Sequence, residues 1–198
     1  MNAFEFHCPT KIICGEGSLH KLPVKIADRG VTKPLIVTDT NLIKLGIAEQ
    51  VFAPLREADV NYSLYDHVPP DSSLNVVNEV ATLYREEKCD GWIALGGGSV
   101  IDTAKGAAAS VSVGEKDFTD LQGSEILQDE LDPLIAIPTT AGTGSEVTLV
   151  AVVADTENHA KLSYTSYRLV PHIAFLDPKL TASLPPRLTA TTRIDALT

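Results

Sequence analysis

The amino-acid sequence predicts an α/β protein with a Rossmann-like parallel sheet flanked by helices, and three observations support this class. Short apolar runs of strand length alternate along the 198 residues with segments whose apolar residues recur at helical spacing. Such alternation is typical of parallel strands joined by right-handed helical crossovers. One run, Trp92–Leu95, carries no charge and suits a central strand, and it leads directly into three glycines and an alanine-rich helix.

The composition narrows the class of protein and its partners. A hydrophobic content of 44% is enough for a real core. The net charge of −10 and the lack of a basic cluster make nucleic acid and anionic membranes poor candidates as partners. Three cysteines without a CxxC pair argue against a disulfide framework or a zinc knuckle. With no signal peptide and no apolar run long enough to span a bilayer, we expect a cytoplasmic protein.

In the first half of the chain, apolar spacing and turn residues predict strands and helices in alternation. The expected elements are a hairpin of Phe4–Phe6 with Lys11–Ile13, a short helix over Ser18–Ala27 interrupted near Pro23, a strand over Pro34–Asp39, a helical stripe from Leu42 to Leu55, a strand over Val60–Tyr65, a rigid loop at Val68–Asp71 and a helix from Leu74 to Tyr84.

The second half continues the same pattern after the central strand, glycine loop and helix of Gly91–Val113. The expected elements are loop and short helix in Asp117–Asp132, a strand at Leu134–Ile137, a polar loop at Pro138–Glu146, a strand at Val147–Ala154 with a hairpin partner at His159–Tyr164, a last strand at Ile173–Leu176, a turn-rich linker at Leu180–Leu188 and a helix from Thr189.

The glycine loop Gly96–Gly98 is the first candidate ligand site. Glycines without Cβ atoms let a ligand approach the backbone, and Ser99 with Asp102 three residues on has the spacing of an N-cap and a capping box. A helix beginning here would direct free N–H groups over the end of a strand, where a phosphate or pyrophosphate can bind. The alternative is a tight strand-to-helix connection without a ligand.

Asp39 ends the strand that precedes this unit, and it allows two interpretations. A carboxylate at a strand end can accept hydrogen bonds from both ribose hydroxyls of an adenosine, and it repels a 2′-phosphate, which favours NAD over NADP. It can equally cap the helix that follows. The acid precedes the glycines here, which reverses the order of the common dinucleotide fingerprint, so the fold is expected to be Rossmann-like without that fingerprint.

The second polar loop follows another buried strand and combines glycines with hydroxyl side chains. Thr139, Thr140, Thr143 and Ser145 can surround a polar ligand with hydroxyls and backbone N–H groups without adding charge. Lys161 is the cation near this region, and on its own it is best explained as a solvated lysine.

These stretches together resemble the iron-containing (group III) alcohol dehydrogenase family, and specifically its N-terminal nucleotide-binding domain, which is similar to that of dehydroquinate synthase. The matching stretches, in family order, are Pro9–Leu19, Ile36–Leu42, Gly96–Gly106, Ile137–Thr148, Asp177–Pro186 and Thr189–Thr198. The pair GGGSxxDxAK and PTTAGTGSE is specific. The resemblance implies a dinucleotide-binding domain at residues 1–186, and residues 187–198 as the start of an all-helical metal-binding domain that this chain otherwise lacks.

The resemblance also assigns roles to residues of this sequence. The implied cofactor is NAD rather than NADP, and the implied contacts with it are Asp39, Gly96, Gly97, Gly98, Ser99, Asp102, Thr139, Thr140, Thr143 and Lys161. Asp195 matches the first ligand of a metal, Fe²⁺ or alternatively Zn²⁺. The family's three histidine ligands would follow beyond Thr198, so no catalytic residue lies within this chain, and we expect the chain alone to be inactive.

The implied function is hydride transfer between a primary or small alcohol, or its aldehyde, and NAD, with this chain as the cofactor-binding part. The alternatives are a stand-alone nucleotide-binding module and an enzyme similar to glycerol dehydrogenase or dehydroquinate synthase. An apolar face near Leu188–Leu197 suggests that the protein forms homo-oligomers.

Overall fold

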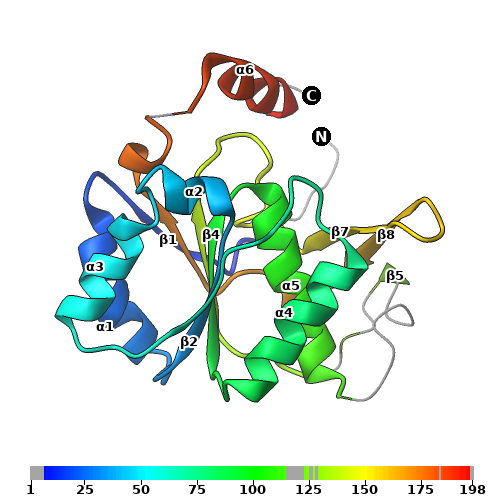
Figure 1. Ribbon diagram of the computed structural model, residues 1–198, viewed down its shortest axis with the longest axis horizontal. Coiled ribbons are helices and arrows are strands. Elements are labelled where there is room, and N and C mark those ends of the chain that lie inside the picture. Colours follow the sequence, from blue (N-terminus) through cyan, green and yellow to red (C-terminus); the bar gives the residue numbers. More distant parts are fainter. Residues whose placement is uncertain (1–6, 115–122, 125–126, 128, 183, 197–198) are drawn as a thin grey trace, which may run out of the picture.

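The computed structural model describes residues 7–114, 123–124, 127, 129–182 and 184–196, and its centre is a six-stranded parallel sheet (Figure 1). The strand order is β1-β9-β6-β4-β2-β3. The strands are β1 Lys11–Cys14, β2 Pro34–Val37, β3 Ser63–Tyr65, β4 Gly91–Gly96, β6 Leu134–Pro138 and β9 Ile173–Leu176. The sheet and the helices that flank it confirm the predicted class.

Helices cover both faces of this sheet, as its apolar strands require. The described helices are α1 Leu22–Ala27, α2 Thr40–Lys44, α3 Glu49–Glu57, α4 Leu74–Glu86, α5 Gly98–Ser112 and α6 Pro186–Asp195, with short 3₁₀ turns at Ser18–Lys21, Tyr167–Leu169 and Pro178–Leu180. Helices α4 and α5 pack on one face, and α1 and α3 pack on the other (Figure 1). Alternate residues of β4, such as Ala94 and Ile93, enter the two cores in turn.

A small second sheet packs beside α5. It consists of β5 Gly123–Ser124, β8 Ala160–Thr165 and β7 Val150–Asp155, in the order β5-β8-β7. Strands β7 and β8 pair antiparallel, which confirms the predicted hairpin. Their inward residues, among them Val153 and Leu162, belong to the same core as α4 and α5, so this sheet has a fixed position beside the site.

The chain changes direction between β2 and β4, and this determines where a ligand can bind. From β2 the chain passes outward to β3, and then returns through α4 to β4 on the other side of β2. Connections leave the carboxyl ends of β2 and β4 in opposite directions, which leaves a crevice there. Asp39 and the loop Gly96–Gly98 follow these two strands, so the fold brings the first two predicted site segments together.

Several element boundaries differ from the sequence prediction. Strand β1 pairs parallel with β9, with Lys11 N donating to His172 O at 3.0 Å, and its expected hairpin partner Phe4–Phe6 lies outside the described residues. The stripe expected from Leu42 to Leu55 is two helices, because Gly46 breaks it with a φ of 71°. The expected strand Val60–Tyr65 is shorter and begins at Ser63.

Proline accounts for two further boundaries. In the segment Ser18–Ala27 a 3₁₀ turn precedes α1, which has Pro23 in its first turn. Helix α6 begins at Pro186, three residues before the predicted start, because proline suits the first turn of a helix. Most of the predicted loop and helix in Asp117–Asp132 lies outside the described residues.

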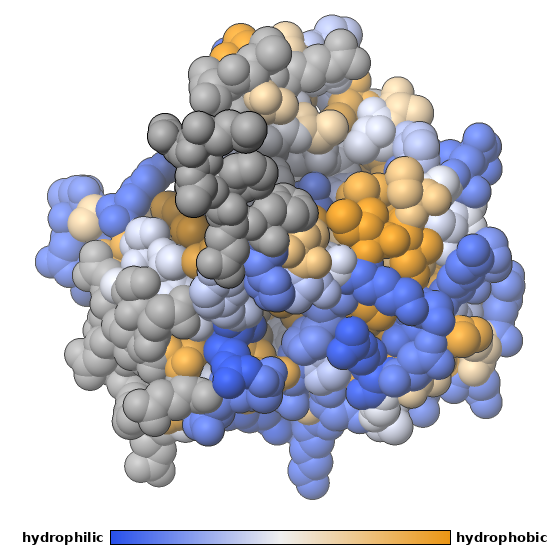
Figure 2. All heavy atoms as spheres, turned by 180° about the vertical axis from the view of Figure 1, so that it is seen from behind, coloured by the Kyte–Doolittle hydropathy of each residue, from blue (hydrophilic) through white to orange (hydrophobic). Residues whose placement is uncertain are grey.

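The surface behind the view of Figure 1 is mainly hydrophilic and carries a hydrophobic patch (Figure 2). The edge strands of the main sheet contribute exposed apolar side chains, since Ile12 on β1 is 49% exposed and Leu64 on β3 is 37% exposed. Every helix in the described part of the chain is too short or too polar to cross a bilayer.

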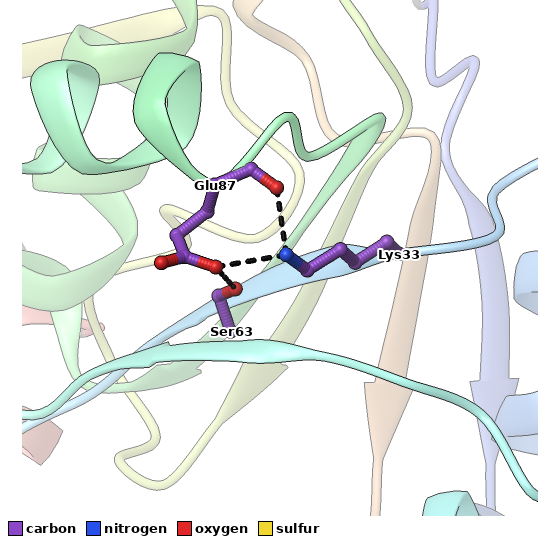
Figure 3. A network of polar contacts seen from close by, with 3 residues as sticks. All are labelled: Lys33, Ser63 and Glu87. Carbon is purple, nitrogen blue, oxygen red and sulfur yellow. Dashed lines mark hydrogen bonds and ion pairs between the residues drawn. The ribbon is translucent and has the colours of Figure 1, made fainter.

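A polar network closes the opposite, amino-terminal end of the sheet (Figure 3). Lys33 Nζ donates to the Glu87 carbonyl oxygen at 2.7 Å and to Glu87 Oε2 at 2.8 Å, and Ser63 Oγ donates to the same carboxylate at 3.0 Å. These bonds lower the pKa of Glu87 and raise that of Lys33. The network joins the approaches to β2 and β3 to the end of α4, away from the crevice.

The central strand should dominate stability. Ile93→Ala removes a fully buried side chain from β4, so we expect the free energy of unfolding to fall by about 3 kcal/mol, within the range for such cavities. The matched change Ile12→Ala, at a half-exposed edge position, should cost less than about 1 kcal/mol. Urea denaturation followed by circular dichroism measures both. Equal losses would contradict the two-sided core described above.

Candidate functional site

The first glycine loop turns from β4 into α5 and lies against the second loop. A Cβ on Gly97 would meet the Thr140 side chain at 3.3 Å, and a Cβ on Gly98 would meet Thr143 Cγ2 at 3.2 Å. The missing side chains therefore let the two loops lie side by side. Gly96 has another role: a Cβ there would lie 2.5 Å from Val100 Cγ2, so this glycine is needed for packing of the helix on its strand.

The prediction that Ser99 caps this helix is wrong. Helix α5 starts at Gly98, its N-cap is Gly97, and no side chain caps it. Ser99 therefore lies inside the first turn, where its hydroxyl donates to the carbonyl oxygen of Pro70. Asp102 is not part of a capping box either, because its Oδ2 accepts from Val152 N at 3.1 Å. Without a side-chain cap, the N–H groups of the first turn are available to an anion.

Asp39 is confirmed as a helix cap. Its Oδ1 accepts hydrogen bonds from Asn41 N at 2.8 Å and Leu42 N at 3.1 Å, and so fixes the start of α2. The second oxygen, Oδ2, takes no part in this cap. Asp39 also lines a cavity, so the cap and a ligand contact are compatible, and the ribose contact stays a prediction.

Two cavities meet at the glycine loop. The larger, of about 490 Å³, contains four of the predicted site residues, and the smaller, of about 200 Å³, contains five. The larger is lined by Asp39, Gly97, Thr139 and Thr140. The smaller is lined by Gly98, Ser99, Asp102, Thr143 and Lys161. Gly96 lines neither cavity.

The two cavities differ in chemistry. Leucines and Pro185 line much of the larger, which suits a flat apolar group such as a base. The smaller is polar, and its carboxylate Asp102 is mostly buried. Burial raises the pKa of Asp102, while the charge of Lys105, the Val152 N–H and the Ser145 hydroxyl oppose that shift.

Two buried polar atoms in this region have no hydrogen-bond partner among the described residues. They are Thr140 Oγ1 and Asp102 Oδ1. Thr140 lines the larger cavity and Asp102 the smaller, and buried polar atoms are normally satisfied. Together with the uncapped helix, these atoms fit a ligand that has phosphates and hydrogen-bond donors, as a dinucleotide does.

The residues described do not by themselves form a metal site. No group of three or more histidine, cysteine, aspartate or glutamate side chains in the described part of the chain could hold a metal ion. The backbone of Asp195 forms the end of α6. A single carboxylate does not hold iron, because such sites need several ligands fixed together.

Lys105 is a residue of this region that the sequence analysis missed. It lies in α5 and is fully buried. The signal was available in the sequence: a lysine among alanines, on the helical face that packs on a sheet, must bury its charge or leave that face. Asp102 lies three positions earlier on the same helix.

The last helix rests directly on the second loop. A Cβ on Gly142, whose φ is 153°, would lie 1.8 Å from the carbonyl oxygen of Thr192 in α6. Leu188, also from α6, lines the larger cavity together with Leu184 and Pro185. Helix α6, which ends at Asp195, therefore lies over the carboxyl end of the sheet (Figure 1), and its Leu188 forms part of the wall of the larger cavity.

The fold and the two cavities define a Rossmann-like α/β domain with a binding crevice at the carboxyl end of its sheet. Comparison with protein families matches residues 9–178 to the description "Iron-containing alcohol dehydrogenase". The chain belongs to the iron-containing alcohol dehydrogenase family, as its motifs predicted.

Individual relatives agree with this assignment. The choline dehydrogenase of Bacillus subtilis (strain 168) is 41% identical over 194 residues, which are 97% of this chain and 48% of that protein. The NAD-dependent methanol dehydrogenase of Bacillus methanolicus is 34% identical over 192 residues, covering 97% of this chain and 50% of that protein.

Solved structures agree as well. The sulfoacetaldehyde reductase from Bifidobacterium kashiwanohense, in complex with NAD⁺, has a TM-score of 0.87 and 28% identity over 98% of this chain and 51% of that chain. This chain spans about half the length of these relatives.

Replacing Gly142 should release α6. We expect Gly142→Ala to force the backbone of Thr192 away, because 1.8 Å leaves no room for a methyl group. Hydrogen exchange of residues 186–195 should accelerate severalfold. Gly144→Ala is the matched control. An alanine at its φ of 65° costs about 1 kcal/mol of backbone strain, but the added Cβ would lie 3.8 Å from its nearest neighbour, Thr148 Cγ2, and so displaces nothing. Equal exchange in both variants would show that α6 does not depend on this contact.

Proposed function

We propose that this chain is the NAD(H)-binding part of an alcohol dehydrogenase that transfers hydride between a small alcohol, or its aldehyde, and the nicotinamide ring. The observation that carries the proposal is the pair of cavities, one apolar and one polar, that meet at the uncapped start of α5. A dinucleotide has the matching order of parts: a base, a pyrophosphate and a second nucleoside.

The predicted residues that line the two cavities then have roles in binding. The larger cavity takes the adenosine, with Asp39 accepting from ribose hydroxyls. The N–H groups of Gly98, Ser99 and their neighbours hold the pyrophosphate, and the hydroxyls of Thr139, Thr140 and Thr143 complete that wall. Asp102 and Lys161 lie by the nicotinamide nucleoside. The names of two relatives, an NAD-dependent methanol dehydrogenase and a reductase solved with NAD⁺, support the choice of cofactor.

NAD supplies the hydride chemistry when bound, and this chain orients it. The residues described bind the cofactor and supply no group that removes the alcohol proton. We infer that residues 1–186 form the cofactor domain, and that residues 187–198 begin a helical domain to which Asp195 contributes one metal ligand. The metal, iron by family and zinc as the alternative, needs further ligands for any step at the alcohol oxygen.

We also infer that the protein self-associates and works in the cytoplasm. Leu188 and Ile194 on α6 are 48% and 59% exposed, and a hydrophobic patch lies on the face of Figure 2. Apolar surface of this kind marks a contact. The three thiols, none in a disulfide, suit a reducing compartment.

Cofactor choice should depend on the charge of Asp39. Wild-type chain should bind NADH about tenfold or more tightly than NADPH, because the carboxylate repels a 2′-phosphate. Asp39→Asn keeps a good helix cap and removes the charge, so the preference should shrink while the melting temperature hardly changes. Energy transfer from Trp92, the single tryptophan, to bound nicotinamide measures both affinities.

Asn41→Ala is the control for this experiment, since it changes a neighbouring cavity residue without changing charge. Equal binding of both cofactors by the wild type would remove Asp39 as the selector. Binding of neither would contradict the proposed function itself.

The chain alone should turn over no alcohol. With NAD⁺, Fe²⁺ or Zn²⁺, and a primary alcohol, we expect no NADH absorbance above a protein-free blank, because the described residues assemble no metal site. Measurable NADH formation that scales with protein concentration would overturn this expectation.

A further inference from the structure

Lys105 is a buried charge that the proposed function does not use. Its side chain is fully buried, and its Nζ donates to Thr148 O at 2.8 Å, to Thr148 Oγ1 at 3.3 Å and to Val150 O, in the first residue of β7, at 2.9 Å. A buried ammonium is costly even when it is hydrogen-bonded, and an apolar side chain would fill the same space. The charge therefore calls for an explanation beyond packing.

One acceptor of Lys105, Val150 O, lies at the outer edge of strand β7. Strand β7 is the last of the small sheet, and in the described part of the chain its outer edge pairs with no strand, apart from an isolated bridge between Ala154 and Ser73. Three groups from outside the sheet satisfy that edge in sequence: Lys105 bonds to Val150 O, Asp102 Oδ2 accepts from Val152 N, and Ser72 O accepts from Ala154 N at 2.7 Å. Two side chains of α5 thus replace a neighbouring strand.

Asp102 connects this edge to the smaller cavity. One oxygen of its carboxylate accepts from Val152 N, and the Ser145 hydroxyl lies near enough to the carboxylate to lower its pKa. The other oxygen, Oδ1, is buried and has no hydrogen-bond partner among the described residues. Asp102 and Val152 both line the smaller cavity. An ionised carboxylate oxygen only accepts hydrogen bonds, so the group that satisfies Oδ1 must be a donor, such as a ribose hydroxyl.

We propose that Lys105 is a positioning residue that holds β7 against α5 and keeps Asp102 ionised and fixed as the acceptor for a hydroxyl of the cofactor. Asp102 lies three residues earlier on α5, so the two side chains share one face of the helix, and the ammonium charge favours the carboxylate. The proposal rests on the proposed function, since it takes NAD(H) as the ligand of the smaller cavity.

The charge state of Lys105 gives the proposal a pH signature. Burial lowers its pKa to about 8, while the charges of Asp102 and Glu146 oppose that shift. Lys161 is the cation among the residues that line the smaller cavity. NADH affinity should be constant at lower pH and fall as Lys105 loses its proton. The contribution of Lys105 to the free energy of unfolding changes with pH in the opposite direction. The unfolded chain binds this proton more tightly than the folded chain does, so this contribution rises with pH between pH 8 and 10.5. Weaker NADH binding in this pH range is therefore not caused by unfolding.

The experiment is a double-mutant cycle on NADH affinity, measured by energy transfer from Trp92. Lys105→Met and Asp102→Asn should each weaken binding about tenfold, and the double variant should be little worse than either, because both changes remove the same fixed acceptor. Lys25→Met is the control, since Lys25 lies on α1 and pairs with Asp28. It should bind like the wild type.

The pH profile supplies the second measurement. From pH 6.5 to 9.5 the NADH affinity of the wild type should decline with a midpoint near 8, while the affinity of Asp102→Asn should not change with pH. This comparison can be made even if the Lys105→Met variant fails to fold. A hundredfold, additive loss in the double variant, or a Lys105→Met protein that melts lower yet binds NADH with the wild-type profile, would overturn the proposal. Wild-type protein that binds no NADH would instead overturn the proposed function.

Discussion

The close approach of two loops is the constraint on which the site depends. Gly97 and Gly98 carry no side chains where Thr140 and Thr143 come within 3.3 Å and 3.2 Å of their notional Cβ positions. Because the loops follow neighbouring strands, β4 and β6, the parallel pairing of those strands sets their separation. The two cavities lie at this contact, since Gly97 and Thr140 line the larger, and Gly98 and Thr143 line the smaller.

The sequence predicted the alternation of strands and helices, the hairpin of β7 and β8, and nine of the residues that line the two cavities. These are local signals, since periodicity and glycine content act within a few residues. The pairing of β1 with β9 and the role of Ser99 depend on partners far along the chain. Ser99 reaches the Pro70 carbonyl across a crossover, so its spacing to Asp102 carried no information about that bond.

The role of Lys105 also depends on a partner far along the chain and could not be predicted from the local sequence. A lysine in an alanine-rich helix contradicts the local pattern, and the pattern alone does not say what resolves the conflict. The conflict is resolved at the outer edge of β7, where Lys105 donates to the Val150 carbonyl oxygen, which no strand in the described part of the chain satisfies. The local sequence pattern does not predict this residue because its role is a tertiary contact with β7. Such conflicts between local pattern and tertiary structure are concentrated near functional sites.

The helix cap made by Asp39 has a consequence for the thermodynamics of binding. Two backbone N–H groups hold Oδ1, so the side chain is immobilised when the protein folds. The rotamer entropy of this carboxylate, of order 0.5–1.5 kcal/mol for an interface side chain, is then lost before any ligand arrives. Oδ2 is preorganised, and recognition of a ribose here should carry a smaller entropic penalty than recognition by a freely rotating acid.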